Sequence, residues 1–499
     1  MNNEDWLRHF GRFAPLPGNL PEPLALRYHG HQFRTYNPDL GDGRGFLFAQ
    51  LRDGGGRLLD LGTKGSGQTP YSRFGDGRLT LKGGVREILA TEMLEALGVN
   101  TSRTFSLVET GEALHRGDEP SPTRSAVLVR LSHGHIRIGT FQRLAYFQDA
   151  EAMRRLVEYC LTHFFGCDDE KARHCEARSG EAIQPVAGFG ARGLLRSARN
   201  DEAGGDQGAD EALGEGADAV ARFFAEVAKG CARLAASYIA AGFVHGVLNT
   251  DNINVTAESF DYGPWRFTPM WDGHFTAAYF DETGLYSFGR QPEAIHWNLV
   301  QLAASLRLIA EADALTPAIE AFPDLFRKEL AAAMLWRLGV KPRDEAEDAA
   351  LLLAIERALV EKIVTIDRFF FDWRGGRLRG DARETGADGD AKEAAAMQSA
   401  NLPGAATHPA PGEGLSSLPY KETSPYKAQA FAEFRKKVAA YEPVSDALSH
   451  VYWSDDAPCS LHIEEVESIW AAIDERDDWR PLQDKIAAMR RMGEALRGA

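Results

Sequence analysis

Cysteine is scarce in this chain, and the few cysteines form no metal or disulfide motif. The 499 residues contain five cysteines, and none stands in a CxxC pair. This pattern excludes a dense disulfide framework and a zinc ribbon, and it predicts reduced thiols. His29 and His31, or His174 beside Cys175, lack a second ligand pair at a recognisable spacing, so they do not predict a metal site.

Long apolar runs and an excess of positive charge are also missing. No run approaches the roughly 18 to 20 apolar residues that a membrane helix needs. The opening MNNEDWLRHF lacks the pattern of a signal or transit peptide. The 72 Asp and Glu outnumber the 56 Lys and Arg, and the net charge of −16 opposes binding to nucleic acid or anionic lipid. We therefore expect a cytoplasmic protein with no nucleic-acid partner and no membrane partner.

The composition is that of a soluble globular protein, with 44% hydrophobic and 26% charged residues. A chain of this length predicts two or three packed sub-domains. Residues 1–23 are rich in Pro and aromatic side chains, which predicts an extended arm without a regular element.

The next part of the chain predicts a sheet with one helix. Short apolar runs broken by Gly indicate a small antiparallel sheet over 44–82, with a hairpin turn at 53–56. Gly83 and Gly84 are expected to end its last strand, just before the helix begins. The remaining expected elements are a helix from 85 to 98, closed by Gly98, and strands at 101–110 and 125–131.

Helical periodicity dominates after residue 140. Helices are expected at 150–165, 220–242 and 294–312. Two stretches rich in Gly, Ala and acidic residues have little to bury, which predicts a mobile insertion at 176–217 and a flexible linker at 376–418. A helical tail is expected over 419–499.

The densest polar cluster lies at 245–264, in HGVLNTDNINVTAESFDYGP, directly after a long amphipathic helix. Asn252 and Asp261 stand on either side of an alternating INV strand and a TAES turn. A tight hairpin there would bring an amide oxygen and a carboxylate to one magnesium ion, as in protein kinases. The alternative is a polar hairpin whose Asn and Asp only cap turns.

The match to a kinase catalytic loop is partial. Counted from His245, Val247 occupies the position of the kinase base, whereas Asn252 falls where the kinase Asn should. Asp251, immediately before the expected metal ligand, is a candidate proton acceptor for a different substrate pose. The departure indicates altered chemistry or none.

Lys64 lies at the end of a predicted strand, in LGTKGSG, and Glu87 lies on the helix that follows. A strand Lys paired with a helix Glu aims an ammonium group at nucleotide phosphates in kinases. Glu92 is nearer the middle of the apolar stripe and is the inward carboxylate by periodicity alone. Surface positions for these charged side chains are the remaining alternative.

Three Gly-rich segments, at 41–45, 64–70 and 74–78, can bring backbone N–H groups close to phosphate oxygens. None of the three matches the Walker or Rossmann fingerprint. Arg130 and Arg137 flank a strand and turn, and both can fork onto phosphates or form surface salt bridges.

Taken together, these residues resemble the selenoprotein O family of protein adenylyltransferases. The similar blocks are YHGHQF, LGDGRG, LGTKGSGQTPYSRFGDGR, VREILATEMLEALGV, VRLSHGHIRIGTFQ, GFVHGVLNTDNINV, DYGPW and GRQPEAIHWNLVQLA. They occur in the family's order and cover most of residues 27–310.

The resemblance implies an α+β, protein-kinase-like, two-lobed fold. It implies an N-lobe with a mixed sheet over 24–145, a helical C-lobe over 146–375 and a divergent C-terminal helical tail. It also implies that ATP binds in a flipped orientation with Mg²⁺ or Mn²⁺, so that AMP passes to Ser, Thr or Tyr hydroxyls of proteins and pyrophosphate is released.

The family's functional residues carry over to matching positions here. Asp251 would be the proton acceptor, and Asn252 and Asp261 the metal ligands. Glu87 rather than Glu92 would pair with Lys64. The residues that would line the nucleotide are Gly41, Gly43, Arg44, Lys64, Asp76, Gly77, Arg130 and Arg137.

The chain also departs from the family. Arg34 stands after HQF where members commonly have Gly, and no cysteine occurs between 261 and 300, so a redox switch of the family's kind is not expected. Two other functions remain open. One is a γ-phosphotransferase, against which Val247 counts, and the other is a silent nucleotide-binding scaffold, against which Lys64, Asn252 and Asp261 count.

Overall fold

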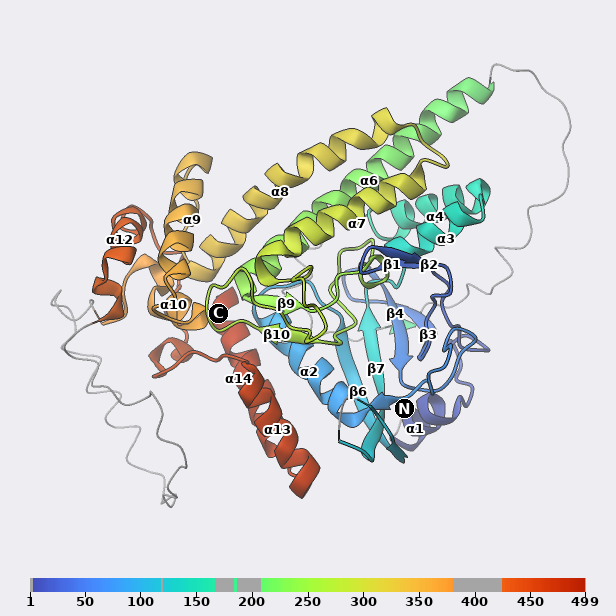
Figure 1. Ribbon diagram of the computed structural model, residues 1–499, viewed down its shortest axis with the longest axis horizontal. Helices are drawn as coiled ribbons and strands as arrows, with labels where there is room; N and C mark the ends of the chain where they lie inside the picture. Colours follow the sequence, from blue (N-terminus) through green and yellow to red (C-terminus); the bar gives the residue numbers. More distant parts are fainter. Residues whose placement is uncertain (1–2, 118–119, 167–183, 186–207, 381–423, 499) are drawn as a thin grey trace, which may run out of the picture.

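The computed structural model describes residues 3–117, 120–166, 184–185, 208–380 and 424–498. Within these ranges the chain is a mixture of helices and small antiparallel sheets (Figure 1). The strands are β1 (Gly30–Gln32), β2 (Thr35–Asn37), β3 (Gly45–Arg52), β4 (Leu58–Lys64), β5 (Leu79–Thr80), β6 (Arg103–Leu114), β7 (Thr123–Ser132), β8 (Gln184–Pro185), β9 (Phe243–His245) and β10 (Trp265–Phe267). The α-helices are α1 (Asn3–Arg12), α2 (Leu81–Ala96), α3 (Ile138–Tyr146), α4 (Ala150–His163), α6 (Gly208–Ala241), α7 (Gln291–Leu306), α8 (Ala312–Leu338), α9 (Glu345–Val360), α10 (Ile366–Asp372), α12 (Ala432–Val438), α13 (Ile463–Arg476) and α14 (Arg480–Arg497).

The largest sheet has the order β5-β7-β4-β3-β8, and β6 also pairs with β7. Each of these pairs is antiparallel, so the small antiparallel sheet is confirmed and the expectation of a mixed sheet is wrong. For β3 and β4 the short connection at 53–57 favours this direction, because a tight turn can join only antiparallel strands. Strand β4, which ends at Lys64, is buried along its whole length.

Helix α2 begins earlier than its apolar pattern indicates. The Thr80 side chain accepts a hydrogen bond from the backbone N–H of Gly83 and caps the helix, which therefore starts at Leu81. Gly83 and Gly84 lie in the first turn instead of ending the strand. A Cβ at Gly84 would be 2.4 Å from Cδ1 of Leu107, so glycine lets β6 lie close against α2. The helix ends before Gly98, as expected, where φ is +77°.

The helical part is built on α6, α7 and α8, which run side by side (Figure 1). Helices α4, α6 and α7 confirm the helices expected at 150–165, 220–242 and 294–312. Their buried faces share one apolar core with α2, including Met93, Val227 and Leu299. Among the described helices, none is long and apolar enough to cross a membrane.

The N-terminal segment contains a helix, so the expectation of an arm without a regular element is wrong. Helix α1 places Trp6 and Phe10 four residues apart on one face, and Phe10 is buried. The Phe10 ring lies 4.9 Å from that of Phe48 on β3, between ring centroids. Packing against the sheet stabilises a helix that its short sequence pattern does not reveal.

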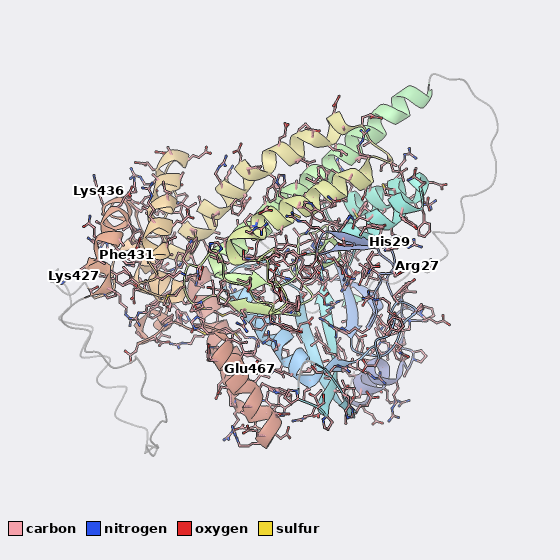
Figure 2. All side chains as sticks on the ribbon, viewed as in Figure 1. Arg27, His29, Lys427, Phe431, Lys436 and Glu467 are labelled. Carbon is pink, nitrogen blue, oxygen red and sulfur yellow. The ribbon has the colours of Figure 1, made fainter. Side chains whose placement is uncertain are left out.

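Helices α13 and α14 pack against α2, and we call this pair the C-terminal brace (Figure 1). Glu467 lies beside α2 (Figure 2) and accepts from Nζ of Lys82 at 2.6 Å. Arg490 binds Glu92 with two hydrogen bonds. A Cβ at Gly493 would be 3.0 Å from Cα of Ala96, so glycine permits the close approach of α14.

Part of the expected organisation falls outside the described residues. The expected insertion at 176–217 is described only at 184–185, which form β8, and at 208–217, which belong to α6. The expected linker at 376–418 is described only as far as 380.

Candidate active site

The polar loop 246–264 is framed by a strand pair. Strands β9 and β10 flank it and pair in antiparallel fashion, with His245 opposite Trp265. The expectation of a hairpin inside the loop is wrong. The loop backbone instead forms isolated β-bridges with other segments, from Asn254 to Arg137 and from Ser259 to Thr101. Thr250–Asn252 instead form a single 3₁₀ turn, η1.

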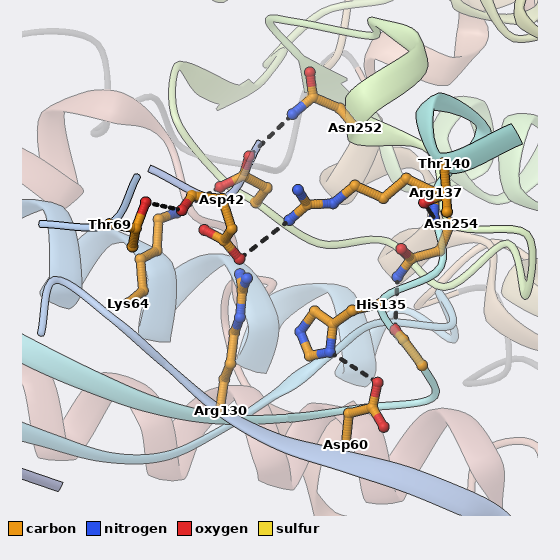
Figure 3. A network of polar contacts seen from close by, with 12 residues as sticks. Asp42, Asp60, Lys64, Thr69, Arg130, His135, Arg137, Thr140, Asn252 and Asn254 are labelled. Atoms are coloured by element: carbon orange, nitrogen blue, oxygen red, sulfur yellow. Dashed lines mark hydrogen bonds and ion pairs between the residues drawn. The ribbon is translucent and has the colours of Figure 1, made fainter. Parts of the chain in front are cut away.

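The loop nevertheless brings Asn252 and Asp261 together. Nδ2 of Asn252 donates to Oδ2 of Asp261 at 3.0 Å (Figure 3). Nζ of Lys64 donates to the other carboxylate oxygen, Oδ1, at 2.8 Å. The same ammonium group donates to Oε2 of Glu87 at 2.6 Å, and Lys64 and Glu87 are both buried. Strand β4, helix α2 and the polar loop thus meet at one charged cluster.

Glu92, the alternative partner of Lys64, lies elsewhere. Its carboxylate binds Arg490 of the C-terminal brace. The structure therefore pairs Lys64 with Glu87, although helical periodicity alone favours Glu92.

Two buried arginines add positive charge to the cluster. Arg130, on β7, lies 3.5 Å from Oε1 of Glu87 through its Nη1 atom. Arg137 lies between the rings of Tyr28 and Phe260, at 4.2 and 5.0 Å from their centroids. The Nε atoms of both arginines are buried without a hydrogen-bond partner among the described residues. Buried polar groups are rarely left unpaired in folded proteins, so these two atoms are candidates for bonds to water or to an anion.

Asp42 is the carboxylate that faces Arg137, with Oδ2 3.9 Å from Nη2 (Figure 3). Sequence reasoning did not single out Asp42 or Tyr28 as site residues. Both stand inside the quoted blocks, in LGDGRG and YHGHQF, and that position was the only available signal.

Asp251 has the environment of a proton acceptor. The residue is 9% exposed, and Oδ1 is buried without a hydrogen-bond partner among the described residues. Burial raises the pKa of Asp251 to about 6, although Arg137 acts in the opposite direction. A carboxylate with a pKa near neutrality is suited to general-base catalysis.

Asp261 has the opposite electrostatic environment. Burial favours its neutral form, but Lys64, Arg130 and Arg137 outweigh burial and hold the pKa of Asp261 well below its usual value. The pKa values of the two carboxyl groups are thus shifted in opposite directions. Asp261 stays ionised, while the pKa of Asp251 is about 6.

The glycine-rich segments lie against each other next to Lys64. Oγ1 of Thr69 donates to the backbone oxygen of Asp42 at 2.6 Å, and Oγ of Ser72 donates to that of Gly43. A Cβ at Gly41 would lie 2.3 Å from the Tyr71 ring. Gly77 has a φ of +72°, and a Cβ there would lie 2.2 Å from the backbone of Gly67. Gly41 thus permits the close approach of Tyr71, and Gly77 permits that of Gly67.

Arg44 and Asp76 are less involved in the charged cluster. Arg44 is exposed, and its backbone oxygen accepts from the N–H of Gly65 at 2.7 Å. Asp76 forms a salt bridge with Arg116 at 2.8 Å and receives the backbone N–H of Arg78. Most of the expected site residues therefore lie in or next to the charged cluster. Asp76 instead forms an ion pair with Arg116.

The donor set fits a magnesium ion that phosphates help to bind. In the part of the chain that the structure describes, no group of three or more His, Cys, Asp or Glu could hold a metal by itself. Oδ1 of Asn252 is buried without a described partner, and the Asp261 carboxylate is adjacent. Mg²⁺ commonly takes one or two protein oxygens and completes its shell with phosphates and water.

Comparison with known proteins gives consistent findings. A family model described as "Protein adenylyltransferase SelO" matches residues 1–490. A protein nucleotidyltransferase YdiU from Trichormus variabilis is 35% identical over 493 residues, which are 99% of this chain and 87% of the relative. The protein of the same name from Synechococcus elongatus is 38% identical over 500 residues, covering 99% and 87%. The one from Synechocystis sp. is 46% identical over 340 residues, covering 68% and 62%.

Proposed function

Because this chain belongs to the protein adenylyltransferase SelO family, we propose that it transfers AMP from ATP to Ser, Thr or Tyr hydroxyls of proteins. The observation that carries this proposal is the Asp251 carboxylate. It is buried, lacks a described partner for Oδ1, and lies beside a cluster of cations suited to phosphates. The proposed cellular site is the cytoplasm.

The reaction follows from these groups. Asp251 accepts the proton of the attacking hydroxyl, and the hydroxyl oxygen bonds to the α-phosphorus of ATP. The bond from that phosphorus to the oxygen leading to the β-phosphorus breaks, and pyrophosphate leaves with the electron pair. Lys64, Arg130 and Arg137 offset the negative charge of the triphosphate, and their fixed positions reduce the reorganisation that the reaction requires.

Asn252 and Asp261 would hold Mg²⁺ or Mn²⁺, and Glu87 would keep Lys64 in place. The bound ion would supply positive charge that offsets the charge of the phosphates. The low pKa of Asp261 supports this assignment, because the carboxylate stays ionised and available to a cation. Backbone groups of Gly41, Gly43 and Gly77 would border the nucleotide, with Arg44 and Asp76 at its edge.

We also propose a two-lobed, kinase-like layout for this family member. The N-lobe would comprise 24–145, which contain the antiparallel sheet and α2, and the C-lobe 146–375, which contain α6, α7 and α8. The charged cluster draws Lys64 and Glu87 from the first part and Asn252 and Asp261 from the second. A nucleotide bound there would lie between the two parts.

Two other functions remain in competition. Transfer of the γ-phosphate is disfavoured, since Val247 stands in the kinase base position and Asp251 is the carboxylate with the shifted pKa. A silent scaffold is disfavoured because Lys64, Asn252 and Asp261 are all retained and lie together.

The deciding experiment is protein labelling with ATP that carries ³²P at either the α or the γ position, in the presence of Mg²⁺ and a candidate lysate. We expect label from the α position only. Label from the γ position only would overturn the proposal in favour of phosphotransfer. Absence of both labels, with ATP binding intact, would favour the scaffold.

A further inference from the structure

A closed ring of hydrogen bonds includes Thr250, the residue before Asp251. The ring connects three distant parts of the chain. The backbone N–H of His31, on β1, donates to Oγ1 of Thr250 at 2.7 Å. That hydroxyl donates to Oε1 of Gln142, on α3, at 2.7 Å. Nε2 of Gln142 lies 2.7 Å from Nδ1 of His31 and closes the ring.

The donors and acceptors in this ring have a single consistent direction. The Thr250 hydroxyl donates its one proton to Oε1 of Gln142, and the Gln142 amide nitrogen, which can only donate, donates to Nδ1 of His31. Nδ1 of His31 must therefore be unprotonated. Burial lowers the pKa of His31, which favours this neutral form. Each group in the ring has one defined role.

The ring fixes the backbone next to Asp251. Thr250 is fully buried and immediately precedes Asp251 in the 3₁₀ turn η1. Strand β1 also contacts this turn directly, since a Cβ at Gly30 would lie 3.1 Å from Oγ1 of Thr250 and 3.3 Å from Cβ of Asp251. Strand β1 therefore lies against Thr250 and Asp251, in the turn that Gln142 anchors through Thr250.

Helix α3 positions two residues of the site, Arg137 and Gln142. Arg137, at its N-terminus, lies near the acidic groups of the site, and Gln142 follows one turn later. The backbone N–H of Ile138 donates to the oxygen of Ile253 at 3.0 Å, and that of Val255 donates to the oxygen of Ile136 at 2.9 Å. The segment before α3, the start of α3 and the loop with Asp251 therefore form one hydrogen-bonded unit.

We propose that Gln142 is a positioning residue, which orients Asp251 through Thr250 relative to the phosphate site that Arg137 lines. This inference rests on the proposed function. Gln142 is 5% exposed and contacts Asp251 only through Thr250, so we expect it to act on the rate of transfer and to leave ATP binding to the charged cluster.

The test compares matched variants in AMP transfer from α-labelled ATP. Gln142→Leu and Thr250→Val each remove the ring with little change in shape, and we expect each to lower kcat about tenfold with KM for ATP within about twofold of wild type. Thr250→Ser keeps the hydroxyl and should restore most of the rate. Because both substitutions break the same ring, the double variant should be no slower than the slower single variant.

A second measurement separates this inference from the proposed function. Hydrogen exchange of the amides at 250–252 should accelerate at least about fivefold in Gln142→Leu, while the amides of α2 keep their wild-type rates. Unchanged exchange, or an unchanged kcat in folded Gln142→Leu, would overturn the inference, as would rate losses that multiply in the double variant. A wild-type protein that transfers no label would refute the proposed function, and the exchange measurement would still decide whether Gln142 holds the turn.

Discussion

The pair Glu87 and Glu92 allows a controlled test of the charged cluster, because both lie on α2 and accept the same substitution. Glu87 is buried between Lys64 at 2.6 Å and Arg130 at 3.5 Å. Glu92 binds Arg490, whose side chain is 65% exposed. Glu87→Gln removes a buried negative charge, whereas Glu92→Gln removes one from the margin of the C-terminal brace.

The expected losses of unfolding free energy differ several-fold between the two variants. Removing one partner of a buried ion pair typically costs about 3–5 kcal/mol. We expect the lower end, about 3 kcal/mol, because Asp261 remains 2.8 Å from Lys64 and the glutamine oxygen still accepts a hydrogen bond. The Glu92 pair should contribute less than about 1 kcal/mol, since its partner Arg490 is largely exposed and solvent weakens such ion pairs.

The assay is urea-induced unfolding of both variants beside wild type, followed by tryptophan fluorescence. A second readout is calorimetric titration with MgATP. In Glu87→Gln, the ammonium group of Lys64 loses one of its two carboxylate partners and moves toward Asp261, so ATP affinity should fall while Glu92→Gln binds as wild type does. Equal losses of unfolding free energy in the two variants, or wild-type ATP affinity in Glu87→Gln, would refute the reasoning.

Three further outcomes are expected. Below about pH 6, kcat/KM for AMP transfer should fall about tenfold per pH unit, because burial raises the pKa of Asp251 to about 6 and only the ionised carboxylate accepts a proton; a flat profile down to pH 5 would contradict this role. Asp261→Ala should abolish transfer and Mg²⁺-dependent ATP binding, and undiminished activity of this variant would remove Asp261 from the metal site. Gly493→Leu should destabilise the protein by about 1–3 kcal/mol in thermal unfolding, since the new side chain starts 3.0 Å from Cα of Ala96 and separates α14 from α2.

The sequence predicted those parts of the fold that local patterns control. Short apolar runs bounded by turn residues located β3, β4, β6 and β7, and helical spacing located α2. The start of α2 was misplaced because glycine usually ends a regular element, whereas here Gly84 makes room for Leu107. That requirement comes from packing between elements and is not visible in a local pattern.

Helix α1 was missed for a related reason. Its segment is short and is followed by several prolines, which are typical of an irregular chain. The spacing of Trp6 and Phe10 was the available signal, but its meaning depends on Phe48, which lies on another element.

In the site, Lys64, Asn252 and Asp261 could be chosen from motifs, while their partners depended on distant residues. Periodicity alone favoured Glu92 over Glu87. The sequence does not show that Arg490, on a distant helix, forms an ion pair with Glu92. The ring around Thr250 joins residues from three separate segments, so no spacing rule could reveal it.

The C-terminal brace also affects how the protein is made. Translation adds about 5–20 residues per second, so α14 follows α2 by roughly 20 to 80 seconds. During that interval the helix that carries Glu87 lacks Arg490 opposite Glu92 and Gly493 against Ala96. A nascent chain therefore presents the α2 surface to chaperones or to solvent. The helix that carries Glu87 therefore gains its contacts with Arg490 and Gly493 only after α14 has been synthesised.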